Sequence, residues 1–121
     1  MSLPQYNFEF VSGETFKLEI TYKDSSGSVI NLTSGYRVDI DGRTDEDSSS
    51  TLFAVDSTTS AITLGSSGPN ISLVLDATTT GGISAPTSGV YDVKVNKTSA
   101  TPDEITYILG GKFTVTKAIT A

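Results

Sequence analysis

The residues best able to do chemistry in this chain are the carboxylates of the run DIDGRTDED at positions 39–47. The candidate calcium ligands are Asp39, Asp41, Asp45 and Asp47. Calcium takes about six to eight oxygen ligands, which clustered carboxylates can supply. The order differs from an EF-hand loop, because Gly42 directly follows Asp41. The alternative interpretation is a solvated strand face that runs into a charged loop.

Two side chains that carry much enzyme chemistry are missing from this sequence, which has no His and no Cys. Proton transfer near neutral pH loses its usual side chain, and transition metals lose their commonest ligand. Thiolate zinc sites and disulfides are impossible. A glycosidase-like carboxylate pair would need two carboxyls about 5–10 Å apart in a cleft, and no Asp or Glu stands in a sharply apolar stretch. We therefore expect no enzyme activity and no cofactor.

The charge balance argues against two classes of partner. The net charge is −6, the pI is about 4.3, and only 8 Lys and Arg residues are present. A phosphate backbone and an anionic membrane surface both need clustered basic residues. No apolar run approaches the ~20 residues of a membrane-spanning helix. We expect neither nucleic acid nor membrane as a partner.

Hydrophobic periodicity predicts the elements that must position these residues. Apolar residues alternate with polar ones in most of the chain, a pattern typical of half-buried strands. The predicted strands are 6–11, 16–23, 36–41, 51–55, 61–65, 71–75, 89–96 and 105–117, with a brief extended piece at 29–30. Residues 76–87 are either an open loop or begin with a helical turn at Asp76. The sequence predicts one domain, residues 1–121, with an all-β, immunoglobulin-like antiparallel β-sandwich of about 7–9 strands.

Particular residues in this scheme carry local predictions. The DSSG sequence at 24–27 is typical of a type I turn, and the Gly110-Gly111 pair predicts a bulge or bend in the last strand. The Asn-x-Ser/Thr triplets at Asn31, Asn70 and Asn96 are interpreted as turn residues.

The stretch SGVYDVKV resembles the Gly-x-Tyr-x-Cys run of immunoglobulin-like domains, with Val93 at the cysteine position. This resemblance implies a tyrosine corner, in which the Tyr91 hydroxyl bonds back to nearby backbone.

A wider resemblance covers residues from about Phe8 to Thr116. The segments GETFKLEITYKDSSGSVINLTSGY, ITLGSSGPNISLVL, GVYDVKV and GGKFTVT resemble small tailed-bacteriophage virion proteins. They look like the N-terminal immunoglobulin-like domain of phage upper baseplate proteins. The loop between Arg43 and Ser60 departs from that pattern. The resemblance implies a structural role in a tail, baseplate or neck, repeated around a symmetry axis.

The expected contacts are those of a docking module that carries no reaction centre. Edge strands at 6–11 and 113–117 are the candidate docking edges. The interface candidates are Tyr6, Phe8, Tyr107 and Phe113. We expect a homo-oligomer in a symmetric assembly, partnered by other virion proteins and located in the virion, which assembles in the host cytoplasm. A capsid decoration protein and a carbohydrate-binding or host-surface adhesion module are the alternatives.

Overall fold

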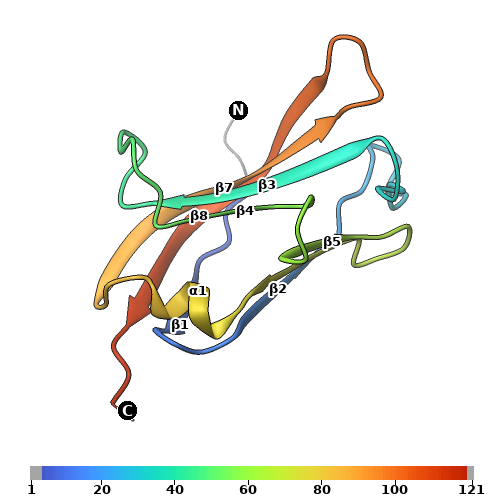
Figure 1. The fold of residues 1–121 in the computed structure, drawn as a ribbon. Coiled ribbons are helices and arrows are strands. Elements are labelled where there is room, and N and C mark those ends of the chain that lie inside the picture. The colour runs from blue at the N-terminus through green and yellow to red at the C-terminus, as the bar shows by residue number, and fades with distance from the viewer. Residues whose placement is uncertain (1–3, 120–121) are drawn as a thin grey trace.

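The computed structural model describes residues 4–119, which form two β-sheets packed face to face (Figure 1). The strands are β1 Phe8–Val11, β2 Phe16–Ile20, β3 Tyr36–Arg43, β4 Phe53–Asp56, β5 Ile62–Leu64, β6 Ile71–Leu75, β7 Thr87–Lys97 and β8 Glu104–Thr116, and the helix α1 is Ala77–Gly81. The five-stranded sheet has the order β1-β8-β7-β3-β4, and the three-stranded sheet has the order β2-β6-β5. The predicted all-β sandwich is confirmed.

The predicted alternation is what closes the two sheets over a core. On β3, Val38 and Ile40 are fully buried while the residues between them face outward. Their partners Val95 and Val93 on β7 are buried on the same side. Across the interior, the buried face of β6 consists of Ile71, Leu73 and Leu75. Each such side chain contributes roughly 1.5–3 kcal/mol of transfer free energy when it leaves water.

An aromatic cluster fills the end of the core beside β1. The ring of Phe8 lies 4.6 Å from that of Phe16 and 4.8 Å from that of Tyr91, measured between centroids. Phe10 and Phe113 stack with an interplanar angle of 7°. These rings join both sheets, because Phe16 belongs to β2 and the others to the five-stranded sheet.

One strand pair departs from the predicted antiparallel arrangement. β1 runs parallel to β8, with Phe8 opposite Phe113. Gly110 and Gly111 explain how the N-terminal segment enters: a Cβ on Gly111 would lie 2.2 Å from the Tyr6 carbonyl oxygen. The register irregularity lies just before the glycines, where Leu109 and Tyr107 face consecutive residues of β7. The glycines therefore allow the backbone of the N-terminal segment to lie close to β8, and the bulge lies beside them.

The Tyr91 hydroxyl bonds to backbone, but to a remote segment. It donates to the Tyr6 carbonyl at 2.5 Å, whereas a tyrosine corner would bond to nearby chain. Burial, and then the nearby Tyr6, raise the pKa of Tyr91 to about 12, so the hydroxyl keeps its proton and its role as a donor. Tyr91 thus ties the segment before β1 to the middle of the sheet.

Two segments that the sequence left open or misassigned are now defined. Residues 29–30 form no regular strand, although Val29 makes an isolated bridge with Lys23 and the Ile30 N–H donates to the Tyr22 carbonyl at 3.2 Å. Residues 76–87 begin with the helical turn α1, which Asp76 caps by accepting from the Thr79 N–H at 2.7 Å.

Asn70, which the sequence suggested to be a turn residue, is fully buried and lies just before β6. Its Oδ1 accepts from the Tyr22 N–H at 2.7 Å. Its Nδ2 donates to the carbonyls of Tyr22 and Ile30 at 2.9 and 2.8 Å. The amide therefore adds to the sparse backbone pairing of the 22–30 hairpin. Asn31 does form the predicted turn, accepting from the Thr33 N–H at 3.0 Å, while Asn96 lies within β7.

Candidate functional site

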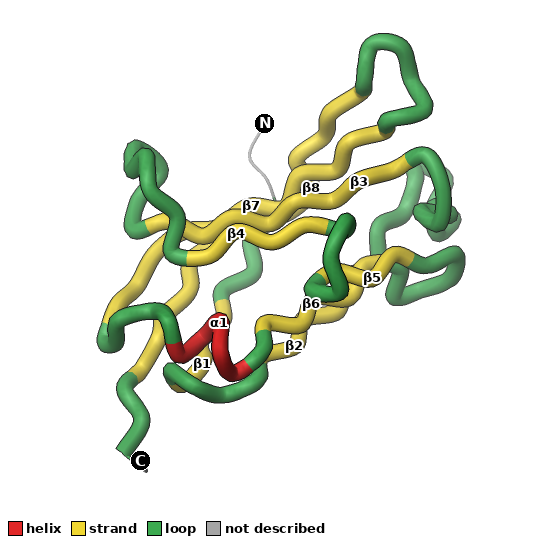
Figure 2. Tube along the Cα trace, in the orientation of Figure 1, coloured by secondary structure: helices red, strands yellow, loops and turns green. Residues whose placement is uncertain are grey.

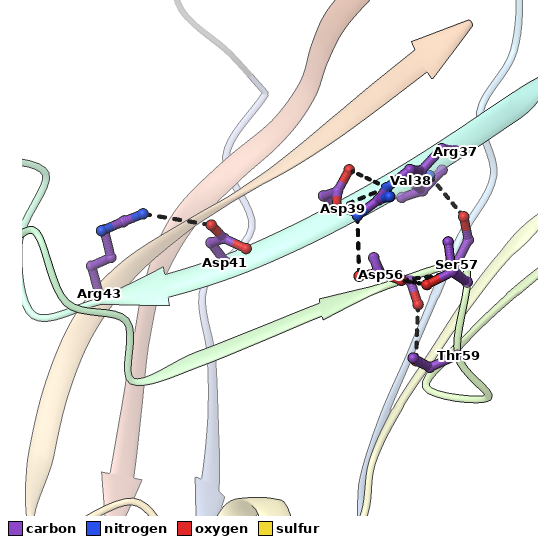
Figure 3. A network of polar contacts seen from close by, with 9 residues as sticks. Arg37, Val38, Asp39, Asp41, Arg43, Asp56, Ser57 and Thr59 are labelled. Atoms are coloured by element: carbon purple, nitrogen blue, oxygen red, sulfur yellow. Dashed lines mark hydrogen bonds and ion pairs between the residues drawn. The ribbon is translucent and has the colours of Figure 1, made fainter. Parts of the chain in front are cut away.

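The outer face of the five-stranded sheet carries a group of charged side chains that includes Asp39 and Asp41 (Figure 3). β3 supplies alternate outward residues because Val38, Ile40 and Gly42 point into the core. Arg37 lies 3.0 Å from an oxygen of Asp39 and 3.2 Å from one of Asp56. The hydrogen bond to Asp39 and the charges of both carboxylates raise the pKa of Arg37.

A turn after β4 completes this charged group. Asp56 accepts a hydrogen bond from the Thr58 hydroxyl and another from the Thr58 N–H, and these hold the pKa of Asp56 below its ordinary value. The hydroxyl oxygen of the next residue, Ser57, accepts a hydrogen bond from the Val38 N–H at 3.0 Å. The backbone N–H of Ser57 donates to the Val38 carbonyl at 2.9 Å. The turn is therefore fixed to β3 by both backbone and side chain.

Further along the same face lies a shallow polar hollow of about 480 Å³ between β3, β7, β8 and the segment before β1. Asp41 on β3 lies directly opposite Asp92 on β7. Burial, and then the charge of Asp41, raise the pKa of Asp92, while Arg43 and Lys94 partly oppose that shift. Arg43 also lies 3.6 Å from Asp41. The hollow therefore brings two carboxylates, Asp41 and Asp92, close to the guanidinium of Arg43.

The candidate calcium ligands are spread over separate local interactions. Asp39 pairs with Arg37, and Asp41 pairs with Arg43. Asp45 accepts from the Asp47 N–H at 2.9 Å, which closes the loop on itself. Within residues 4–119, no three acidic side chains are grouped so that they could hold one ion. The structure does not bring the four candidates together as a site.

The predicted interface residues fall into two groups. Tyr6 and Tyr107 are each 49% exposed. Phe8 is only partly exposed and belongs to the aromatic cluster. Phe113 is 1% exposed, so the prediction that it forms part of an interface is wrong: it faces inward from β8. Likewise the 113–117 edge is not free, since β1 pairs with β8 along Phe113–Thr116.

The sequence did not single out Ile105, although it is 53% exposed. It lies near the tip of the β7–β8 hairpin, which rises away from the rest of the sandwich (orange in Figure 1, and its green loop in Figure 2). Ile105 lies opposite Asn96 and Tyr107 opposite Lys94, so both point from the outer face of β8. The signal was present, because strict alternation places Ile105 and Tyr107 on one side of the strand.

Comparison with known proteins gives no family assignment. No protein-family model matches the chain, and no curated protein is detectably similar to it. In the part of the chain that the structure describes, no helix has the length and apolar character needed to cross a membrane.

Proposed function

We propose that this chain is a non-catalytic structural module of a tailed-phage particle, part of the tail, baseplate or neck, where it docks onto other virion proteins. The observation that carries the proposal is the projecting β7–β8 hairpin, which presents Ile105 and Tyr107 to solvent. Exposed large apolar side chains grouped on one surface are typical of protein contact sites. The sandwich beneath the hairpin supplies a rigid support.

The sequence resemblance to phage virion proteins supports the same proposal through its turn motifs. In the DSSG turn, Asp24 accepts from the N–H groups of Ser26 and Ser28 at 2.9 and 3.1 Å. Such side-chain closure fixes a tight turn. The motifs that carry the resemblance therefore form turns of the β-sandwich, which agrees with a structural role.

Fractionation of phage particles tests the proposal directly. Particles from a culture that produces this chain would be disrupted, and heads and tails separated on a gradient. Mass spectrometry of each fraction should find the chain with tail, baseplate or neck proteins. Recovery with heads alone would favour the capsid decoration alternative. Absence of the chain from all particle fractions would contradict a virion role.

The polar hollow favours a second candidate function, glycan binding at a host surface. Tyr107 lines the hollow together with the carboxylates of Asp41 and Asp92. An exposed aromatic face beside hydrogen-bond acceptors suits a sugar ring. A glycan array with the purified chain tests this candidate, with Tyr107→Ala as the comparison. Binding to one sugar class that disappears in the variant would support it, and an array without signal would remove it.

A further inference from the structure

One stretch of β8 pairs with a neighbouring strand on only one of its two sides among the described residues. Residues 104–109 pair with β7. β1 first reaches β8 at the Gln5–Gly110 bridge and then pairs with it at 113–116. Among residues 4–119, nothing pairs with 104–109 on the side away from β7. We call this stretch the free edge. Its backbone N–H and C=O groups on that side can accept another strand.

Apart from Glu104 at its end, the free edge lacks the charges that interrupt other sheet edges in this chain. Between Ile105 and Leu109 the sequence is ITYIL, with no charged side chain. The other edge strands carry Glu9 on β1, Lys17 and Glu19 on β2, and Asp56 on β4, while β5 spans only Ile62–Leu64. Charged residues and short length commonly prevent pairing between edges. The free edge has no such charge over these positions.

Among the described residues, the position of the hairpin also leaves room for a partner. Figures 1 and 2 show the β7–β8 hairpin extending away from the rest of the sandwich. Ile105 and Tyr107 both stand on its outer face and are about half exposed. An incoming strand would therefore meet the edge and cover two apolar side chains at once.

We propose that the free edge pairs with the free edge of a second copy of this chain, antiparallel and about a two-fold axis at Thr106. Residues directly opposite in an antiparallel pair lie on the same face of the sheet. This register places Ile105 of each copy opposite Tyr107 of the other, which is a favourable β-branched–aromatic pair. The contact is self-complementary, as a two-fold interface requires.

Local charge does not oppose this register, although each copy has a net charge of −6. With the axis at Thr106, Glu104 of one copy lies opposite Ile108 of the other. No acid therefore faces another acid across the new strand pair. The overlap is short because β8 is irregular at Ile108 and β1 begins to contact it at Gly110. We expect a weak dimer whose population depends on concentration.

This inference rests on the proposed docking role of the hairpin and names its partner. Cysteine cross-linking tests it on the full chain, which has no Cys of its own. Directly opposed Cα atoms lie about 4.5–5.5 Å apart, within the range that a disulfide spans. Thr106→Cys should therefore cross-link across the axis under mild oxidation. Thr114→Cys is the matched control: Thr114 is also exposed on β8, but Glu9 and Ser88 already occupy both its sides.

We expect Thr106→Cys to form disulfide dimer at least about tenfold faster than Thr114→Cys, because pairing raises the local thiol concentration. A mixture of Ile105→Cys and Tyr107→Cys chains should cross-link to each other better than either does to itself. Sedimentation of the unmodified chain should show dimer that increases with concentration and is lost in Tyr107→Lys. Circular dichroism melts check that each variant folds.

Three results would overturn the proposal. The first is a monomer at all concentrations with equal cross-linking of the Thr106→Cys and Thr114→Cys variants. The second is a dimer that cross-links best through another position. The third is a dimer that forms only after residues 1–3 are removed. Such a result would mean that the edge is inaccessible when these residues are present. If the chain fails these tests but is found in tail fractions, only the self-pairing proposal is refuted, since the virion role is tested separately.

Discussion

Asn70 and Asn31 lie at opposite extremes of burial, although both occur in an Asn-x-Ser/Thr triplet. Asn70 is fully buried and its amide satisfies three backbone groups of the 22–30 hairpin. Asn31 is exposed and closes a local turn through Thr33. Local sequence predicts the second role, because a turn depends on neighbouring residues. It does not predict the first, because the backbone groups that Asn70 contacts are about 40 and 48 residues away in the chain.

This contrast gives a matched pair of substitutions. We expect Asn70→Ala to lower the free energy of unfolding by about 2–4 kcal/mol, because it removes the side-chain partner of partly buried backbone groups of Tyr22 and Ile30. Asn31→Ala should cost less than about 1 kcal/mol, since water can replace an exposed turn bond. Denaturant unfolding of both variants measures the difference. Equal costs would contradict the structural role of Asn70.

The carboxylate of Asp92 gives a prediction on pH. Burial and the facing Asp41 raise the pKa of Asp92 in the folded state. The folded protein therefore binds this proton more tightly than the unfolded chain does. The ionised carboxylate lowers stability above the folded pKa, and this penalty disappears as the pH falls through that pKa. We expect Asp92→Asn to raise the melting temperature at neutral pH and to have little effect below the ordinary Asp pKa of about 3.9.

Asp56→Asn is the control with the opposite sign. Hydrogen bonds from Thr58 lower the pKa of Asp56, so its ionised form stabilises the fold at neutral pH, and that contribution is lost as the pH falls through the folded pKa. Thermal melts of both variants across a pH series compare them. A lower melting temperature for Asp92→Asn at neutral pH would show that the carboxylate is not penalised as argued.

At the scale of elements, the strands could be predicted, but how they pair could not. Alternation identified all of the regular strands, since each has one face in the core. It missed the parallel β1–β8 pairing, because periodicity states which face is buried and not which strand lies alongside. It also left Phe113 as an edge contact, whereas β1 covers that part of β8. The outer-face charges were visible in the sequence, but their Arg37–Asp56 pairing depends on the register of β3 and β4.

The N-terminal segment docks beside glycine, and this dependence is testable. We expect Gly111→Ala to destabilise the fold by about 1–3 kcal/mol, because its Cβ would collide with the Tyr6 carbonyl oxygen. Gly82→Ala is the control: the nearest atom to its Cβ would be the Thr78 carbonyl oxygen at 3.5 Å, and its φ of −78° suits alanine. Thermal melting compares the two. A tolerated Gly111→Ala would show that the segment before β1 does not lie against β8.

At the scale of the whole molecule, the fold depends on an apolar interior between two sheets. Val93 is fully buried between Ile40 and Leu109 on the neighbouring strands. We expect Val93→Asp to unfold the domain, because burial of an unpaired carboxylate costs several kcal/mol. Val11→Asp, at a position that is 36% exposed, should leave a cooperative thermal transition. If the Val93→Asp variant melted like the parent, the inner face would be misassigned.

The central claim is that the sandwich acts by presenting its β7–β8 hairpin to other proteins in a particle. The most direct measurement is the amount of chain in purified phage tails when particles assemble with Tyr107→Lys or with Thr114→Lys, quantified by mass spectrometry. We expect Thr114→Lys to be incorporated like the parent chain and Tyr107→Lys to be lost from tails while remaining folded. Equal incorporation of both variants, or the absence of even the parent chain from particles, would contradict the account.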